Sequence, residues 1–313
     1  MKAAGLHAGL VLVLFTLQFV LPEYHHANMA RIMVYAILAI GYNILFGYTG
    51  LLSLGHAMFF AAGAYGAGIA VYWFGAGPGA AFVIGLLSAV AMSLAAGLIL
   101  LRVSGVAFLI VTLMLAQAAY LSTLYFNTVT LGDQGMVLSK IAPIDLFGTA
   151  LSLAEPSVKY NIALAAFAAA LLVTYWLVRS PIGRVFVAIR ENEPRTRMLG
   201  YNTYLYRFLA IVVSGSIAGL SGTLYCLLFS YAGSSFASLQ YSTLPLLWTL
   251  TGGAGTLIGP LLGTGLMFYL VDISSGFTSS YLIVVGIALV ILTLWFPKGI
   301  AGALRRRFAE WLP

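Results

Sequence analysis

Six neutral polar or aromatic side chains lie within or beside long apolar runs, and they suit hydrogen bonding rather than bond making. They are Asn43, Ser53, His56, Gln117, Trp248 and Thr249. Burying such groups is costly unless they are hydrogen-bonded, so they are candidates for the lining of a passage. A neutral passage with aromatic walls would suit a zwitterionic or weakly polar solute. For His56, the alternative interpretation is a hydrogen-bonded packing residue.

Reactive constellations are missing from the sequence. It contains no Gly-x-x-x-x-Gly-Lys-Ser/Thr phosphate loop, and neither a zinc motif nor a nucleophile motif. Cys226 is the single cysteine, which excludes a disulfide framework and a thiolate metal site. His25 and His26 could hold a stray metal, although a solvated loop pair is the simpler interpretation. We therefore expect no enzyme activity and no cofactor in this chain, so any ATP must be bound by another chain.

The composition is that of a membrane protein. Of the 313 residues, 62% are hydrophobic and only 7% are charged, whereas soluble domains are about a quarter charged. Long apolar runs recur that can cross a hydrocarbon core ~30 Å thick, and their length favours helices over a barrel. The net charge of +7 is then better explained by topology and anionic lipid than by nucleic acid.

The apolar runs predict an all-α, polytopic membrane bundle of about ten spans in one domain, residues 1–313. The run at 241–251 is too short to cross upright, so it is either a short crossing or a re-entrant helix. Residues 5–21 also resemble a signal peptide, but a first span is the favoured interpretation. The predicted spans cover residues 5–21, 30–48, 56–74, 80–101, 105–126, 160–178, 207–231, 241–251, 256–272 and 280–296.

Basic residues orient the predicted spans. If both termini are cytoplasmic, twelve of the fifteen lysines and arginines fall inside, and Arg31, Lys140 and Lys159 fall outside. This asymmetry follows the positive-inside rule. It makes residues 127–159 an external loop, with room for a short surface helix, and makes residues 179–206 cytoplasmic. The bilayer is therefore the first expected partner.

Small residues at a spacing of four predict close helix packing. One row is Ser214, Ala218 and Gly222, with Gly215 and Gly219 beside it. Two further rows are Gly55, Gly63, Ala67 and Gly255, Gly259, Gly263. The alternative is that helices slide or backbone lines a passage at these rows. Asp272 lies at the external end of a predicted span and no other acid falls inside one, which disfavours a proton- or sodium-coupled carrier.

The cytoplasmic stretch from Arg179 to Arg207 holds six arginines. Ile182, Val185, Phe186 and Ile189 form one apolar helical stripe behind Pro181. Pro194 should end that helix, Asn192 or Glu193 could cap a second, and Gly200 could close it. The stripe would either lie on anionic headgroups or fit a partner's groove.

Three segments resemble the branched-chain amino acid permeases of bacterial ABC importers. They are residues 43–57 (NILFGYTGLLSLGHA) with Gly63-Ala64-Tyr65, residues 180–193 (SPIGRVFVAIRENE) with Leu199-Gly200, and residues 251–260 (TGGAGTLIGP). Residues 132–135 (GDQG) resemble a shortened external motif of the M-type subunit. The similarity runs from about residue 30 to residue 300.

The resemblance implies a subunit of the bacterial inner membrane that works with a periplasmic solute-binding protein, two cytosolic ATP-binding subunits and a homologous second permease. Residues 179–206 would be the segment that docks on an ATPase. The expected docking residues are Arg184, Arg190, Glu191, Asn192, Glu193 and Gly200.

Two departures from the family pattern bear on function. Pro194-Arg195-Thr196 replaces the usual alanine pair of the docking segment, and the external motif is shortened. We expect import of branched-chain or related amino acids. A secondary carrier or channel for a small neutral solute, such as urea or a short amide, and a non-transporting scaffold remain the alternatives.

Overall fold

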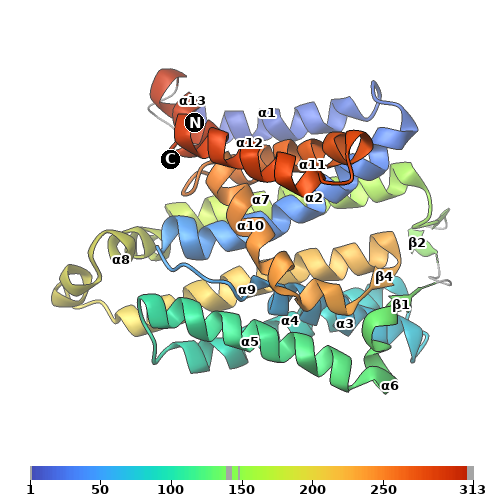
Figure 1. Ribbon diagram of the computed structural model, residues 1–313, viewed down its shortest axis with the longest axis horizontal. Helices are drawn as coiled ribbons and strands as arrows, with labels where there is room; N and C mark the ends of the chain where they lie inside the picture. Colours follow the sequence, from blue (N-terminus) through green and yellow to red (C-terminus); the bar gives the residue numbers. More distant parts are fainter. Residues whose placement is uncertain (1, 139–142, 147–148, 309–313) are drawn as a thin grey trace.

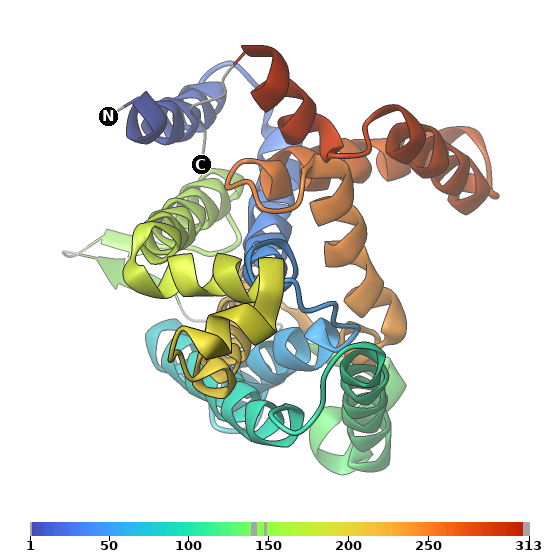
Figure 2. The same cartoon turned by 90° about the vertical axis from the view of Figure 1, so that its left-hand side faces the viewer.

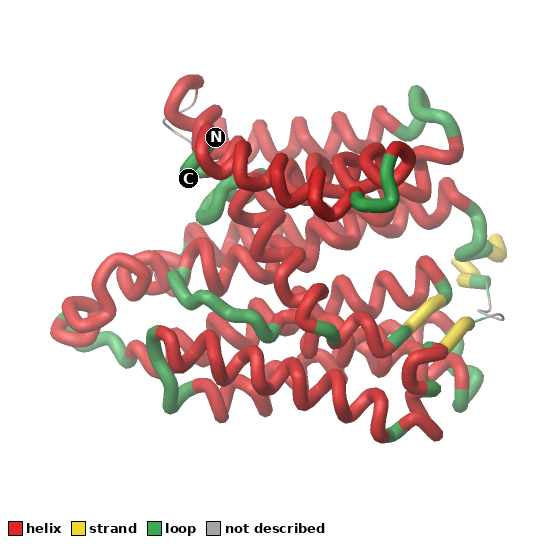
Figure 3. The backbone as a smooth tube through the Cα atoms, viewed as in Figure 1, coloured by secondary structure: helices red, strands yellow, loops and turns green. Residues whose placement is uncertain are grey.

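The protein is a bundle of helices with very little strand (Figure 1, Figure 3). The computed structural model describes residues 2–138, 143–146 and 149–308. Its longer helices are α1 (Lys2–Leu17), α2 (Glu23–Asn43), α3 (His56–Tyr72), α4 (Pro78–Leu100), α5 (Val106–Tyr125), α7 (Pro156–Arg179), α8 (Pro181–Met198), α9 (Thr203–Phe229), α10 (Leu239–Gly252), α11 (Gly259–Phe277), α12 (Tyr281–Trp295) and α13 (Gly299–Phe308).

Short elements complete the connections. They are the π-helix η1 (Ile44–Tyr48), helix α6 (Asn127–Thr130), the 3-10 helices η2 (Gly132–Gln134) and η3 (Ser234–Ala237), and strands β1 (Met136–Val137), β2 (Ile144–Leu146), β3 (Thr149–Leu151) and β4 (Tyr231–Ala232). Strands β1 and β4 pair antiparallel, as do β2 and β3.

Each of the ten predicted spans corresponds to a helix, which confirms a polytopic helical membrane bundle. By length and composition, six of the described helical segments can cross a membrane, and α1, α3, α10 and α11 are the shorter or less apolar members of the predicted ten. Several bounds differ from prediction. Helix α2 begins at Glu23 rather than near residue 30, and α7 begins at Pro156, which shortens the predicted loop 127–159. Lys140 lies outside the described residues.

The two predicted extramembrane segments lie at opposite ends of the bundle. Helix α8 lies at one end, together with the start of α1 and with α13, whereas α6, β1 and β2 lie at the other (Figure 1). Viewed from the first end, α8 crosses in front of the helices (Figure 2). An even number of crossings produces this arrangement.

Helix α9 is the centre of the packing, and its small residues make this possible. A Cβ added at Gly222 would lie 1.9 Å from the carbonyl oxygen of Phe60 in α3, and one at Gly219 would lie 2.0 Å from Cβ of Ala89 in α4. Ser214 and Ser221 donate hydrogen bonds to carbonyl oxygens of α2, at 2.6 Å each. The row predicted on this helix is thus a packing face.

Two long helices are each followed by a break and then by a shorter helix. Helix α2 ends in η1, and residues 49–55 turn back into the bundle before α3 starts; Thr49, Ser53 and Gly55 are buried there. Helix α9 is followed by β4 and η3 before α10 starts, and β4 lies at the end of the bundle away from α8 (Figure 1). The break after α2 and the break after α9 therefore lie toward opposite ends of the bundle.

The predicted row Gly255, Gly259, Gly263 is wrong as a single helix face. Helix α11 begins at Gly259, and Gly255 lies in the turn before it with φ +75°. The other two glycines do allow close approach, because a Cβ at Gly263 would lie 1.8 Å from the carbonyl oxygen of Trp248 in α10. A helical repeat in the sequence cannot by itself show where the helix starts.

We predict that Gly222→Ala destabilises the protein whereas Gly286→Ala does not. The added methyl at Gly222 has no room, and overpacking typically costs about 1–3 kcal/mol. Gly286 in α12 has nothing within 4 Å of a built Cβ, so alanine there gains about 0.5–1 kcal/mol of helix stability. Thermal unfolding in detergent should give shifts of opposite sign; equal midpoints would contradict close α3–α9 packing.

Candidate functional site

Helix α8 consists of two short helices, as predicted. Ser180 caps the first, with its hydroxyl accepting from the backbone N–H of Gly183 at 3.3 Å. Asn192 leaves the helical region (φ −161°, ψ 96°) and its Oδ1 accepts from the N–H of Arg195 at 2.9 Å, so Asn192 caps the second. Gly200, with φ +89°, follows its end. The break leaves room for Pro194, which needs no hydrogen-bonded N–H at the start of a helix.

The apolar stripe of α8 packs on the permease itself. Val185, Phe186 and Ile189 are buried, while Ile182 is 38% exposed. Helix α8 contacts α7, α9 and η1. The two predicted destinations of this stripe, headgroups or a partner's groove, are therefore wrong for three of its four residues. The exposed residues of the segment include Arg184, Glu191, Met198 and Leu199.

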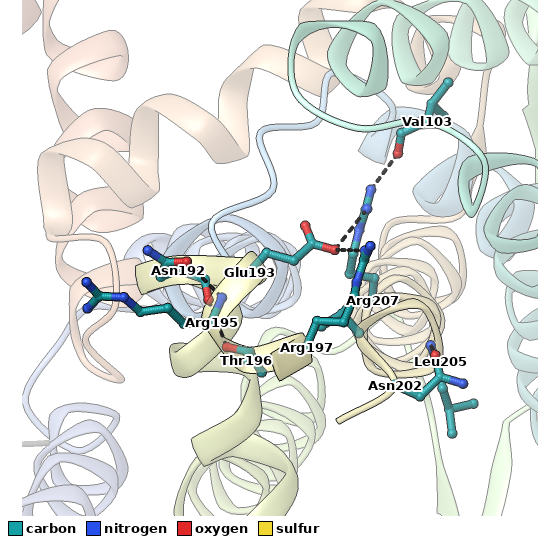
Figure 4. Close-up of polar contacts among 10 residues, drawn as sticks. Val103, Asn192, Glu193, Arg195, Thr196, Arg197, Asn202, Leu205 and Arg207 are labelled. Carbon is teal, nitrogen blue, oxygen red and sulfur yellow. Dashed lines mark hydrogen bonds and ion pairs between the residues drawn. The ribbon is translucent and has the colours of Figure 1, made fainter. Parts of the chain in front are cut away.

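Glu193 joins the second half of α8 to the bundle rather than capping it. Its Oε1 lies 3.6 Å from Nη2 of Arg197 and 3.5 Å from Nη1 of Arg207. Arg207, only 3% exposed, also donates from Nη2 to the carbonyl oxygen of Val103 at 2.5 Å. Figure 4 shows Glu193 and Arg207 pointing toward each other between α8 and the turn that carries Val103. These contacts fix the second half of α8 against α9 and the α4–α5 turn.

A cleft of about 510 Å³ opens beside these contacts. The turn of residues 101–104, the second half of α8 and the start of α9 form its walls. Arg102, Arg197 and Arg207 line it together with one acid, Glu193. The end of the bundle that carries α8 is therefore basic at its surface and in this cleft.

The end of α2 is wound as a π-helix, a form common at functional sites. The N–H of Thr49 bonds to the carbonyl oxygen of Ile44 at 3.2 Å, and Gly50 turns the chain with φ +76°. Gly47 sits inside this turn, where a Cβ would lie 1.9 Å from Oδ1 of Asn43. Only glycine fits at position 47, because the Asn43 amide occupies the space.

Asn43 joins this break to the turn before α11. Its Oδ1 accepts from the N–H of Gly255 at 2.9 Å, and its Nδ2 donates to the carbonyl oxygen of Thr256 at 2.8 Å. The side chain is 1% exposed. One amide thus satisfies a backbone donor and a backbone acceptor that no helix can pair, and the two segments are more than 200 residues apart in sequence.

Arg190 connects α8 to the turn after α2 and lies beside the turn before α11. Its Nη1 donates a hydrogen bond to the carbonyl oxygen of Gly47. A Cβ at Gly50 would lie 2.9 Å from Cγ of Arg190, and a Cβ at Gly255 would lie 2.9 Å from its Nη1. The stem of Arg190 therefore rests on one turn and its guanidinium reaches the other. We call Asn43, Gly47, Gly50, Arg190, Gly255 and Thr256 the α8 junction.

Most of the candidate passage residues are packed and hydrogen-bonded. His56 is fully buried, and its Nε2 lies 2.8 Å from Oγ of Ser214. Ser53 is 1% exposed and its hydroxyl accepts from the N–H of Gly55 at 3.1 Å. Thr249 is buried and donates to the carbonyl oxygen of Ala39 at 3.4 Å. Gln117, in contrast, is exposed on α5.

Trp248 belongs to a cluster of aromatic rings in the half of the bundle away from α8. Its ring lies 5.2 Å from that of Tyr35, which stacks on Tyr225 at 5.3 Å. Phe236 of η3 contacts Tyr225 at 5.2 Å and Tyr241 at 5.1 Å. The cluster closes the space between α2, α9 and α10 in this conformation.

Residues 132–135 (GDQG) contact the start of η3 at the end of the bundle away from α8, and we call this contact the clasp. Oδ1 of Asp133 accepts from the hydroxyl of Ser234 at 2.9 Å. Strand β1 follows the segment and pairs with β4, with Met136 opposite Ala232. The segment thus holds the break after α9, which mirrors what the α8 junction does for the break after α2.

Several residues of these contacts escaped the sequence analysis. Arg207 was counted only as a topology marker, although its position at the start of an apolar run was a signal for a buried cation. Gly255 and Thr256 belong to the predicted glycine row or the family-like segment 251–260, but nothing in the sequence predicted their contact with Asn43, because backbone groups form it. Among the described residues, no group of three His, Cys, Asp or Glu side chains could hold a metal.

The fold and the site define the chain as a helical membrane permease, with a two-helix segment at one end that is hydrogen-bonded to the break after α2. Residues 27–294 match the family described as branched-chain amino acid transport system / permease component. The chain belongs to this family, which is a family of transport permeases and not of enzymes, and it is a permease subunit of an importer.

Two relatives match over most of the chain, and a third matches over less than half of it. The chain is 28% identical over 289 residues to the high-affinity branched-chain amino acid transport system permease protein LivM of Escherichia coli, covering 86% of this chain and 68% of the relative. It is 22% identical to a probable LivM of Methanocaldococcus jannaschii, covering 74% and 75%. A shorter match, 29% identical over 42% of the chain and 37% of the relative, is to the autoinducer 2 import system permease protein LsrC of Photorhabdus laumondii.

We predict that Asn43→Ala loosens the α8 junction. The change leaves a buried N–H and a buried carbonyl unpaired, and each typically costs about 1–3 kcal/mol. The free energy of unfolding, measured by detergent titration, should fall accordingly. Asn161→Ala is the matched control, because Asn161 is exposed on α7 and bonds only to Ser157 in its own helix. Equal stability of the two variants would contradict the role of Asn43 in the α8 junction.

Proposed function

We propose that this permease is driven by ATP that partner subunits bind, and that α8 docks on one of two cytosolic ATPases. The observation that carries the proposal is the hydrogen bond from Arg190 of α8 to Gly47 O, beside Gly255. Movement of α8 would reach the break after α2 through this hydrogen bond, and the turn before α11 lies beside the same side chain. A segment without an external partner would have no need of such a connection.

The positive-inside asymmetry supports a cytoplasmic location for the α8 end and for both termini. The opposite end, with residues 127–155, would then face the outside and meet a solute-binding protein. The basic cleft beside Arg102 and Arg207 fits this orientation, since basic residues concentrate on the cytoplasmic side.

The exposed surface of α8 is the proposed docking surface. Met198 and Leu199 are 85% and 76% exposed at its tip, an unusual position for large apolar side chains in water. Arg184, Glu191 and Asn192 are exposed along the same helix pair, and Gly200 ends it. Arg190 is also exposed, but its guanidinium bonds to Gly47, and the Glu193 carboxylate pairs with Arg207, so we assign both to transmission rather than to contact with the ATPase.

A homologous second permease is the proposed membrane partner. In α12 only Val285 is buried, and α5 is also largely exposed within this chain. Such apolar faces are covered either by lipid or by another helical subunit.

The proposed passage is closed in this conformation. His56, Ser53, Trp248 and Thr249 would come to line it only when α3, α9 and α10 separate, while Gln117 is already exposed. The packed glycines permit such movement, because backbones in contact can slide without dragging large side chains. Alternation between the junction at the α8 end and the clasp at the other end would open one side at a time.

The solute class follows from the relatives and from the interior. The relatives named LivM carry branched-chain amino acid transport in their names, and a neutral, aromatic interior suits a zwitterion with an apolar side chain. We propose branched-chain or related amino acids. A secondary carrier or channel for urea or a short amide is the alternative, and the energy source distinguishes the two.

We predict that Arg190→Ala uncouples the permease without dissociating it. In proteoliposomes with the ATPases, the second permease and the binding protein, uptake of leucine should require ATP. The variant should lower uptake by about tenfold or more, equivalent to ~1.4 kcal/mol of coupling, while the ATPases still copurify.

Met198→Asp provides the complementary control. It removes exposed apolar surface and should prevent copurification of the ATPases while leaving the thermal unfolding of the permease unchanged. Uptake that persists without ATP would instead support the carrier or channel. Wild-type uptake by the Arg190 variant would contradict the transmission role.

A further inference from the structure

An apolar groove of about 610 Å³ runs between α1 and α7, at the edge of the bundle. Figure 2 shows α1 outside α7, away from the central helices. Val11, Phe15, Leu164, Leu171 and Leu172 are among the lining residues. His7 and Tyr175 are the two lining residues that carry a polar side-chain atom, and both lie toward the α8 end.

The two helices touch at both ends of this groove. The rings of His7 and Tyr175 lie 5.4 Å apart at the α8 end. Farther along, the hydroxyl of Tyr160 donates a hydrogen bond to the carbonyl oxygen of Leu14. The groove is therefore a fixed feature between two contacts rather than a gap left by a detached helix.

The length of the groove matches one leaflet of a bilayer. A helix rises about 12 Å from His7 to Phe15, and about 16 Å from Leu164 to Tyr175. Half of a ~30 Å hydrocarbon core is ~15 Å. An apolar groove at this depth provides almost no hydrogen-bond partners for water, and its lining residues lose dispersion contacts if it is empty. An acyl chain supplies those contacts.

A positively charged side chain, Arg179, lies at the α8 end of the groove. The guanidinium of Arg179 lies 4.4 Å from the ring centroid of Tyr175, which places it one helical turn beyond the last lining residue. Arg179 is exposed, and no ion pair joins it to an acid within residues 2–138, 143–146 and 149–308. Its charge is free to meet an anion at the level of the headgroups.

We propose that this groove holds one acyl chain of an anionic glycerophospholipid, with the lipid phosphate on Arg179. The apolar wall selects a chain and the arginine selects the charge, as basic sites beside membrane helices do for anionic lipid. The lipid fills the space between the pinned ends of α1 and fastens that helix to α7. The leaflet is the one on the α8 side.

Native mass spectrometry of the full-length permease tests the site with two lipids of equal chains, phosphatidylglycerol and phosphatidylcholine. The wild type should retain one lipid and prefer phosphatidylglycerol. Ala168→Phe fills the groove and should weaken retention of both lipids by about tenfold or more. Arg179→Gln should keep a lipid bound but abolish the preference for phosphatidylglycerol.

Matched controls lie on α7 and on the neighbouring helix α8. Ala165→Phe adds the same bulk to an exposed position of α7 outside the groove, and Arg184→Gln removes an exposed arginine of α8; neither should change binding. Unchanged retention in Ala168→Phe, or an unchanged preference in Arg179→Gln, would overturn the proposal. So would efficient cross-linking of Leu172→Cys to a second protein chain, because a protein would then cover the groove.

Discussion

Backbone groups freed at helix breaks must find partners inside an interior that offers no water, and this constraint governs the molecule. An unpaired group in hydrocarbon costs several kcal/mol. Asn43 meets the requirement for one break by pairing with Gly255 and Thr256, so two breaks far apart in sequence become one structure. At the opposite end, the β1–β4 pair satisfies backbone groups of the break after α9, and the side-chain hydrogen bond between Ser234 and Asp133 lies beside it.

Arg190 connects α8 to the break after α2. In the proposed mechanism, tilting α8 would either move the turn at Gly47 or break the charged hydrogen bond from Arg190, and the Gly255 turn lies against the same guanidinium. The buried stripe of α8 and the Glu193–Arg207 contact hold α8 against the bundle, which would favour transmission of that movement. The glycine-lined α3–α9 contact then permits displacement with little side-chain rearrangement.

Sequence patterns predicted the local structure well and the long-range contacts poorly. The ten apolar runs and the cap at Asn192 follow from hydropathy and local hydrogen bonding, which are properties of neighbouring residues. The periodicity found the stripe that includes Phe186, but an apolar face does not say what covers it, and the assignment to a partner or to headgroups was wrong. The pairing of Asn43 with Gly255 had no local signature, since backbone groups provide half of it. The glycine row failed because a repeat of four does not reveal where α11 starts.

Hydrogen exchange in the assembled transporter tests the transmission of movement most directly. Residues 44–55 and 253–258 should change their exchange rates together when ATP binds to the partner subunits, because Arg190 and Asn43 join them to α8 and to each other. With Arg190→Ala, the α8 segment should still respond and the two turns should not. The same response of both turns in the wild type and in the Arg190 variant would contradict the account.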